Sequence, residues 1–189
     1  STSISRRSLI AGSIAGTAAI AAPAFAKTAP KWDETVDVIV VGTGFAGLAA
    51  AIEAKKAGAN VIVLEKMTFA GGNSAINGGI MTATGCPQQK LHNIQDSQEL
   101  LEKDILVAGN YMNNRDKVRQ MVSRVLSNYE WCVKELGVEF LPDAIGQEGG
   151  HSVPRYVTTK NGSGSGIVMK ELEYVKKLGV PIRLRTYVE

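Results

Sequence analysis

Residues 36–65 read VDVIVVGTGFAGLAAAIEAKKAGANVIVLE, and this stretch decides the fold. Residues 36–41 form a mostly β-branched run that ends in glycine, which predicts a buried parallel strand. Residues 46–57 place apolar side chains at helical spacing and stop at Gly58, so we expect a helix there. Residues 61–64 repeat the pattern of a buried strand. The three segments predict a strand–helix–strand unit of about 30 residues and therefore an α/β fold with a parallel sheet.

Three glycines, Gly42, Gly44 and Gly47, lie in the turn between the first strand and the helix. The first permits a tight turn, the second lets the backbone approach a diphosphate, and the third lets the helix pack on the strand. The phosphates would then lie at the helix N-terminus, where Phe45 and Ala46 offer free N–H groups and the helix dipole favours negative charge. This turn predicts a nucleotide-binding site.

An acid follows the second predicted strand. Glu65 comes 18 residues after Gly47, where a carboxylate can accept both hydroxyls of a ribose. An acid at this position argues against a 2′-phosphate and hence against NADP. Lys66 belongs to the same turn, and we count it with the site. NAD and FAD share the adenosine diphosphate that this unit binds, so the motif alone does not separate them.

A second glycine-rich stretch separates these two cofactors. Residues 65–80 read EKMTFAGGNSAINGGI and contain the pairs Gly71–Gly72 and Gly78–Gly79, with Asn73 and Ser74 between them. Such a backbone can pass close to a bulky ligand and offer it short polar groups. A nicotinamide needs no second loop, so the stretch favours FAD, and a flexible surface turn is the alternative interpretation.

The rest of the chain predicts further helices and strands. We expect a helix that begins at the cap residue Ser97 and stops at Gly109, and a long amphipathic helix over 115–137. A short strand over 138–141, a helix over 166–178 and a strand over 182–186 follow. The long helix should bury Val118, Met121, Val122, Val125, Leu126 and Tyr129.

Composition excludes some functions. Basic and acidic residues number 21 and 18, so no nucleic-acid partner is indicated. No His/Cys/Asp/Glu cluster has metal-ligand spacing, so we predict no metal site. Cys86 and Cys132 are expected to be free thiols, with one bridge as the alternative.

Three tempting features have simpler interpretations. His151, in a loop with glycine and proline, is expected to be solvated or bonded to backbone rather than catalytic, and His92 is expected to be incidental. The glycine-serine stretch 161–166 could bind a phosphate, but we expect a loop that leads into a helix.

The N-terminus has the features of an export signal. Arg6 and Arg7 precede an apolar run and the small residues Ala24, Phe25 and Ala26, which predicts a signal over 1–26 that is cleaved after Ala26. The run is too short for an ordinary membrane span, although an uncleaved anchor is the alternative. The paired arginines resemble a twin-arginine signal, which indicates export of a folded protein to the periplasm by the twin-arginine translocase.

The segments 37–66 and 71–79 together resemble the flavoprotein subunits of the fumarate reductase and succinate dehydrogenase family, and most of all its soluble periplasmic flavocytochrome c type. The residues QQK at 88–90 and the stretch from His151 onward extend the resemblance. It implies that 27–189 is the N-terminal part of a Rossmann-like FAD-binding domain. The remainder of that domain and a capping domain would lie beyond residue 189, in a larger two-domain flavoprotein.

The resemblance also implies which residues contact FAD. The assigned residues are Gly42, Gly44 and Gly47 for the diphosphate, Glu65 for the adenosine ribose, Asn73, Ser74, Gly78 and Gly79 for the ribityl and flavin side, and the backbone of Val188 for the adenine. Membrane-bound members of the family tether their flavin to a histidine where this chain has Gly72. We therefore expect FAD to be bound non-covalently.

For the chemistry, the resemblance implies hydride transfer from reduced flavin to an α,β-unsaturated carboxylic acid. Fumarate is the first expectation, and methacrylate- or urocanate-type acids are possible substrates. The catalytic arginine and the substrate clamp would lie beyond residue 189, so no catalytic residue is assigned within this chain. Residues 27–33 leave no room for a haem domain before the FAD domain, so electrons would come from a separate c-type cytochrome, which is the expectation, or from a part of the protein beyond residue 189. A non-catalytic electron-transfer subunit and a dehydrogenase of a steroid or an amino acid remain as alternatives.

Overall fold

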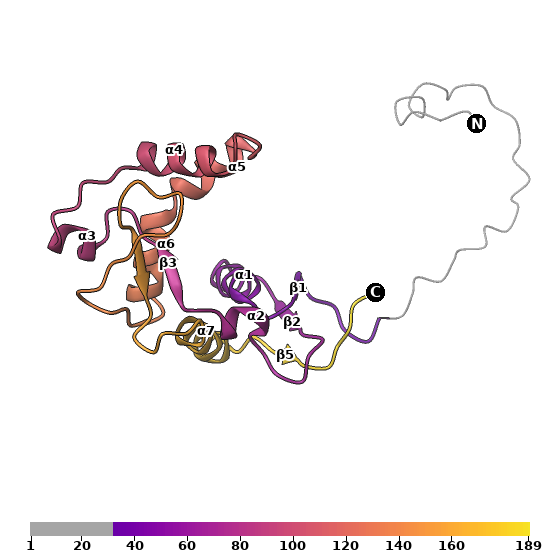
Figure 1. Cartoon of the computed structure of the whole chain (residues 1–189). Coiled ribbons are helices and arrows are strands. Elements are labelled where there is room, and N and C mark those ends of the chain that lie inside the picture. Colours follow the sequence, from indigo (N-terminus) through magenta and orange to yellow (C-terminus); the bar gives the residue numbers. More distant parts are fainter. Residues whose placement is uncertain (1–31) are drawn as a thin grey trace, which may run out of the picture. The chain divides into compact units, whose positions relative to one another are not determined.

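The structure is a computed structural model, and it describes residues 32–189. The expected signal over 1–26 and its cleavage after Ala26 lie outside the described residues. Residues 36–189 form one compact unit, and this unit carries the elements labelled in Figure 1.

A three-stranded parallel sheet organises the site. Strand β1 (Val38–Val41) pairs with β2 (Val61–Leu64), with Val38 opposite Val61, and β2 pairs on its other side with β5 (Ile182–Arg183). Helix α1 (Phe45–Lys56) connects β1 to β2. The predicted strand–helix–strand unit is therefore confirmed. All three strands end at the same edge of the sheet because they run in the same direction.

Two helices cover this unit. Helix α7 (Ser165–Lys177) packs against α1 and against the short helix α2 (Gly72–Ile76), as Figure 1 shows. Leu48, Ile52 and Val175 are fully buried where α1 and α7 contribute to the main core. The first strand is less enclosed, since Ile39 and Val41 remain 60% and 65% exposed.

The middle of the chain adds elements around a second, two-stranded sheet. Strand β3 (Ile80–Thr82) pairs antiparallel with β4 (Tyr156–Thr158). The helices between them are α3 (Pro87–Leu91), α4 (Gln98–Ala108), α5 (Arg115–Val122) and α6 (Val125–Lys134). The sequence patterns predicted neither this sheet nor α2 and α3. The capped helix was predicted correctly, because Ser97 Oγ accepts a hydrogen bond of 3.1 Å from the Leu100 N–H at the start of α4.

The prediction of a single long helix over 115–137 is wrong. The chain forms α5 and α6 with a break at Ser123 and Arg124, where the Ser123 hydroxyl donates to the Gln120 carbonyl at 2.8 Å. Two separate cores explain the break. Val118 and Val122 pack with Leu101 of α4 in a small cluster, whereas Tyr129 belongs to the main core. One straight helix cannot present its apolar stripe to both. Met121, predicted to be buried, is 51% exposed.

Two predicted strands are shorter than expected. Residues 138–141 contribute only an isolated bridge between Phe140 and Thr159. The last strand ends at Arg183 instead of residue 186, because Arg185 adopts a left-handed φ of 55° and turns the chain. The helix predicted over 166–178 is confirmed as α7.

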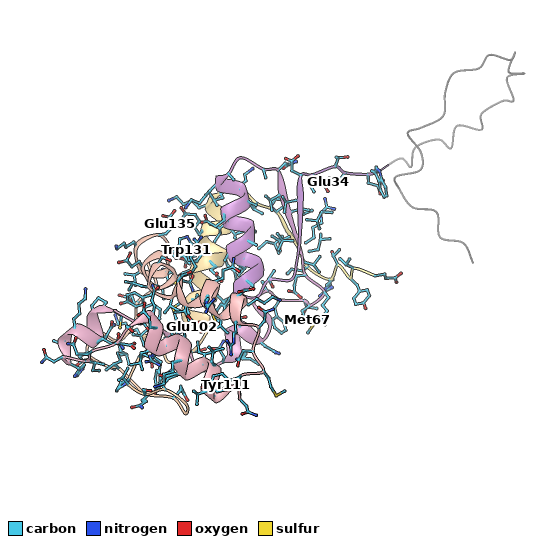
Figure 2. The ribbon with its side chains drawn as sticks, turned by 90° about the horizontal axis from the view of Figure 1, so that it is seen from above. Glu34, Met67, Glu102, Tyr111, Trp131 and Glu135 are labelled. Carbon is cyan, nitrogen blue, oxygen red and sulfur yellow. The ribbon has the colours of Figure 1, made fainter. Side chains whose placement is uncertain are left out.

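Polar contacts fasten α6 to α1. Figure 2 labels Trp131 of α6 and Glu135, the cap residue at the end of that helix. The Trp131 indole donates to Glu53 at 3.1 Å, and Glu135 pairs with Lys56 at 2.9 Å.

Cys86 and Cys132 are both buried free thiols, as predicted. Burial raises the pKa of both, that of Cys132 to about 12, so neither is a ready nucleophile. Among the described residues, no helix combines the length and the apolar character needed to cross a bilayer.

Candidate cofactor-binding site

The glycine turn after β1 has the geometry that its sequence predicts. Gly42 adopts a left-handed φ of 97°, and its N–H donates to the Leu64 carbonyl at 2.7 Å. A Cβ on Gly47 would collide with the Gly42 carbonyl oxygen, so the third glycine is needed for α1 to approach the turn. A Cβ on Gly44 would lie 3.0 Å from Ser74 Oγ. The turn is thus closely packed against α1 and against Ser74.

The N-terminus of α1 suits a negatively charged ligand. Its cap residue Gly44 has no side chain to satisfy the first N–H groups, and no acidic residue occupies the first turn. The Phe45 N–H donates to Ser74 Oγ at 3.2 Å, while Ala46 is exposed. The expectation of a free N–H at Phe45 is therefore wrong, because Ser74 accepts it. The N–H groups of the first turn that follow Phe45, and the positive end of the helix dipole, favour a phosphate at this position.

Glu65 is buried at the end of β2 and held by hydrogen bonds. One carboxylate oxygen, Oε2, accepts from the Thr43 hydroxyl at 2.6 Å and the Thr43 N–H at 3.0 Å, and Oε1 accepts from the Met67 N–H at 2.9 Å. Burial pushes the pKa of Glu65 up, but these hydrogen bonds and the charge of Lys66 outweigh it and lower the pKa. Glu65 is therefore ionised at neutral pH, and its remaining acceptor position can take a hydrogen bond from one hydroxyl of a ribose rather than from both as predicted.

A cavity of about 650 Å³ opens in front of these residues. Its size is typical of small-molecule sites, and glycines and apolar side chains make up most of its lining. The lining residues are Val41, Gly42, Thr43, Gly44, Leu64, Glu65, Lys66, Met67, Phe69, Gly72, Asn73, Ile76, Thr186, Tyr187 and Val188. A close glycine turn, an uncapped helix and an ionised acid in one cavity fit a dinucleotide cofactor.

Seven of the predicted site residues share this lining: Gly42, Gly44, Glu65, Lys66, Gly72, Asn73 and Val188. Val188 reaches it because the chain after β5 stays bonded to the segment after β2. The Thr186 N–H donates to the Glu65 carbonyl at 2.9 Å, and the Arg185 N–H donates to the Met67 carbonyl at the same distance.

Other predicted site residues lie around the cavity or away from it. Ser74 contacts the start of α1, and the Phe45 side chain packs against the main core. Gly79 is buried at φ 66°, and a Cβ there would collide with Thr159 and Ser163. At Gly79, the segment that follows α2 therefore packs closely against the loop that precedes α7. Gly78 is exposed, and neither member of the pair lines the cavity.

The lining also contains five residues that were not predicted, namely Thr43, Met67, Phe69, Thr186 and Tyr187. Thr43 had a signal, since it lies between two glycines of the turn. Residues 186 and 187 had none, because their place depends on the turn at Arg185.

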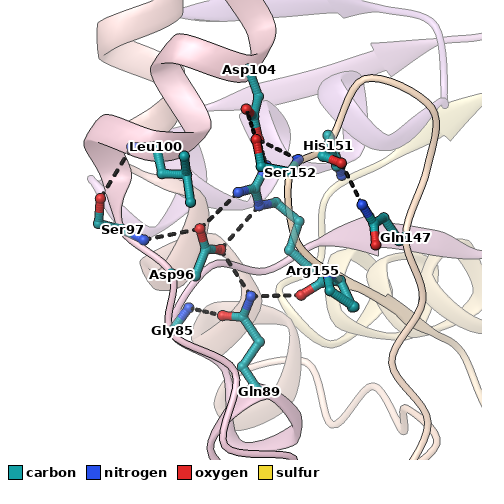
Figure 3. A network of polar contacts seen from close by, with 11 residues as sticks. Gly85, Gln89, Asp96, Ser97, Leu100, Asp104, Gln147, His151, Ser152 and Arg155 are labelled. Carbon is teal, nitrogen blue, oxygen red and sulfur yellow. Dashed lines mark hydrogen bonds and ion pairs between the residues drawn. The ribbon is translucent and has the colours of Figure 1, made fainter.

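A second polar cluster, drawn in Figure 3, lies between β3, β4 and α4. Arg155 is fully buried and donates to both carboxylate oxygens of Asp96, at 3.0 and 2.8 Å, and to Asp104. Ser152 and Arg155 lower the pKa of Asp104 to about 2 against the opposing effect of burial. Because every charge in it is paired, this cluster is a structural network.

The two histidines differ from one another. His151 lies beside this network, and its Nδ1 is buried without a hydrogen-bond partner, so the prediction of a solvated or backbone-bonded side chain is wrong for that atom. Burial and Arg155 lower the pKa of His151. His92 contacts the Asp143 carbonyl through Nε2 at 2.7 Å. Residues 161–166 lead into α7, as expected.

Within residues 32–189, no three His, Cys, Asp or Glu side chains lie close enough together to hold a metal ion.

Comparison with known proteins agrees with this geometry. The chain is 40% identical over 183 residues to the acrylate reductase flavoprotein subunit of Shewanella woodyi, and 38% identical over 135 residues to the urocanate reductase of Eggerthella lenta. These alignments cover 94% and 71% of this chain but only 36% and 22% of the relatives. The chain thus spans about a third or less of their length.

Solved structures give the same result. The open conformation of a flavocytochrome c3 fumarate reductase superposes with a TM-score of 0.76 at 35% identity, over 81% of this chain and 27% of that one. The 3-ketosteroid-Δ4-(5α)-dehydrogenase of Rhodococcus jostii RHA1 superposes with a TM-score of 0.73 at 28% identity, over 85% of this chain and 40% of that one. These likenesses confirm the predicted Rossmann-like fold and the resemblance to the fumarate reductase flavoproteins. The family model described as FAD binding domain matches residues 37–189, and the chain therefore belongs to this family.

Proposed function

We propose that the complete protein is an FAD-dependent reductase of an α,β-unsaturated carboxylic acid. The observation that supports it best is the cavity in which the glycine turn, Glu65 and the start of α2 meet. The relatives named for acrylate, urocanate and fumarate reduction support the substrate class.

The residues of the cavity have separate tasks in this proposal. The turn of Gly42, Gly44 and Gly47, with the exposed N-terminus of α1 at Ala46, holds the diphosphate, and the Phe45 N–H, which donates to Ser74, fixes the start of the helix beside it. Glu65, with Lys66 beside it, accepts a hydrogen bond from the adenosine ribose, and the backbone of Val188 contacts the adenine. Asn73, Ser74, Gly78 and Gly79 serve the ribityl and flavin side. When bound, FAD supplies hydride chemistry.

Gly72 bears on how the cofactor is attached. It lines the cavity, and its missing side chain leaves no nucleophile at the position where membrane-bound family members carry a histidine. We therefore propose non-covalent FAD.

Turnover with unsaturated acids tests the proposal. The full-length protein is supplied with reduced viologen and with fumarate, acrylate, methacrylate and urocanate in separate reactions. We expect oxidation of the dye with at least one acid, fumarate first. An FAD-loaded protein that oxidises no dye with any acid would contradict the reductase proposal and favour an electron-transfer subunit.

A second candidate is a steroid dehydrogenase, which the likeness to the 3-ketosteroid dehydrogenase favours. The same preparation is given a 5α-saturated 3-ketosteroid, 5α-androstane-3,17-dione, and an oxidised dye as acceptor, because a Δ4-dehydrogenase would introduce the double bond that 4-androstene-3,17-dione already contains. This candidate is selected if the steroid reduces the dye and if no unsaturated acid oxidises reduced viologen in the first assay. A dehydrogenase of an amino acid is tested in the same way.

We also propose that residues 1–26 are a twin-arginine signal, that residues 27–189 are part of the FAD domain, and that the protein acts in the periplasm with a c-type cytochrome as electron donor. Changing Arg6 and Arg7 to lysine keeps the charge but removes the paired arginines that the translocase reads. We expect the variant to stay in the cytoplasm with its signal attached. Mature variant that starts at Lys27 and reaches the periplasm in normal yield would overturn the twin-arginine assignment.

A further inference from the structure

Thr43 joins three segments of the cofactor site at one hydroxyl group. Its side chain is fully buried. The hydroxyl donates to Glu65 Oε2 at 2.6 Å and accepts from the Gly71 N–H at 2.8 Å. The glycine turn, the end of β2 and the residue before α2 therefore meet at this atom, although Gly71 lies 28 residues along the chain from Thr43.

The first consequence concerns the carboxylate of Glu65. Its Oε2 accepts two hydrogen bonds, both from Thr43, and Oε1 accepts one from the Met67 N–H. A carboxylate has about four acceptor positions, so Oε1 keeps one free for a ligand. Thr43 thus fixes which oxygen of Glu65 remains available.

The second consequence concerns α2. Its cap residue Gly71 adopts a left-handed φ of 107°, and a Cβ there would lie 2.9 Å from Val168 Cγ1 of α7. Glycine at this position brings no capping side chain, and its own N–H donates to the Thr43 hydroxyl. The next two residues, Gly72 and Asn73, line the cavity. A shift of Gly71 would therefore move part of the cavity wall.

We propose that Thr43 is a positioning residue for FAD binding. Its hydroxyl holds the carboxylate of Glu65 and the start of α2 in place, so that the cavity has its binding geometry before the cofactor enters. The inference rests on the proposed binding of FAD at this site. Pre-formed geometry improves affinity because fewer groups must be ordered on binding.

The test compares two substitutions in the full-length protein. Thr43→Val keeps the shape but removes the hydroxyl, whereas Thr43→Ser keeps the hydroxyl and removes only a methyl group. Apoprotein of each is titrated with FAD, and flavin fluorescence gives the dissociation constant. We expect valine to raise the dissociation constant about tenfold or more, because Glu65 and Gly71 each lose a hydrogen bond. Serine should stay close to the unchanged protein.

A Glu65→Gln background separates positioning from general damage. If Thr43 acts partly through the Glu65 carboxylate, Thr43→Val should raise the FAD dissociation constant by a smaller factor in the Glu65→Gln protein than in the protein with Glu65. An equal increase in the dissociation constant in both proteins would overturn the claim that Thr43 acts through Glu65.

The outcomes distinguish this inference from the proposal on which it rests. Failure of the unchanged protein to bind FAD would defeat both. Binding by the unchanged protein and equally tight binding by the valine variant would overturn the role of Thr43 alone. If valine prevents folding, as judged by circular dichroism, the serine variant decides: a folded serine variant that has lost FAD affinity contradicts a role for the hydroxyl.

Discussion

Arg155 shows how much one residue can organise in this protein. Its guanidinium is fully buried, and it joins Asp96, just before α4, to Asp104 within α4. Gln89 extends the cluster, since its amide donates to Asp96 at 2.9 Å and to the Pro154 carbonyl at 2.8 Å. Residues from α3, from α4 and from the segment just before β4 are thereby joined by polar contacts (Figure 3).

Replacing Arg155 should therefore be costly. Arg155→Met leaves two buried carboxylates without their cation, and we expect a loss of about 3–5 kcal/mol in the free energy of unfolding. Denaturant unfolding measures it. Arg119→Gln is the matched control, because Arg119 pairs with Glu102 at 2.9 Å on the surface and its loss should cost about 1 kcal/mol or less. Similar losses in both variants would contradict a special role for the buried network.

Glu171 makes stability depend on pH. It lies in α7 with 2% of its surface exposed, its Oε2 has no hydrogen-bond partner, and burial raises its pKa to about 8. The unfolded chain releases this proton near pH 4.5, whereas the folded protein keeps it until about pH 8. Stability contributed by the proton is therefore present at low pH and is lost as pH rises between these values.

Glu171→Gln removes this ionisation while keeping the shape. The free energy of unfolding of the unchanged protein should fall by about 3 kcal/mol more than that of the variant between pH 5 and pH 8. Glu173→Gln, which removes an exposed pair with Lys170 at 3.1 Å, should leave the slope unchanged. Parallel pH profiles of Glu171→Gln and the unchanged protein would show that Glu171 is not the group responsible.

At the scale of elements, the contact between α1 and the turn after β1 decides whether the cavity exists. Leu48, Ala51 and Ile52 of α1 are fully buried, so the helix cannot retreat from the sheet. Gly47 allows this approach because it has no Cβ to meet the Gly42 carbonyl. The packing of α1 on the sheet and the shape of the glycine turn therefore depend on one another.

Gly47→Ala tests that coupling. The added methyl group collides with backbone, which cannot move as a side chain can, and we expect a loss of about 1–3 kcal/mol in unfolding free energy together with weaker FAD binding. Ala50→Val places a larger side chain on the exposed side of the same helix and should change stability by about 0.5 kcal/mol or less. Normal FAD affinity in Gly47→Ala would disprove the coupling.

At the scale of the whole molecule, the cavity is assembled from three distant segments. Residues 41–44, 64–76 and 186–188 all contribute to its lining. They meet because β1, β2 and β5 run parallel and end at one edge of the sheet, where α/β proteins commonly bind nucleotides. The chain spans 36% of the acrylate reductase subunit that it resembles, and our proposal assigns this cavity to cofactor binding rather than to the chemistry of a substrate.

The attachment of the cofactor is a property of the whole protein that can be measured directly. Because Gly72 offers no nucleophile, we expect acid or heat to release all FAD from the precipitated full-length protein. Flavin fluorescence of the supernatant, compared with the total after proteolysis, measures the released fraction. Yellow colour that stays with the polypeptide would refute non-covalent binding.

The sequence by itself determined the nucleotide-binding unit. Strand β1, helix α1, strand β2 and Glu65 follow from local rules, since a buried strand needs an apolar run and a tight turn needs glycine with positive φ. The capped start of α4 at Ser97 follows in the same way, because the cap involves residues three apart.

Only the tertiary structure decided the rest. The break between α5 and α6 depends on two cores that lie apart in space, and the sheet of β3 and β4 joins residues that are more than 70 positions apart in the chain. Thr43 could be read as part of the turn, but its contacts with Glu65 and Gly71 exist only once β2 and α2 are in place. Buried polar groups such as Arg155 likewise find their partners through the fold, because a hydrogen bond between distant segments leaves no periodic pattern in the sequence.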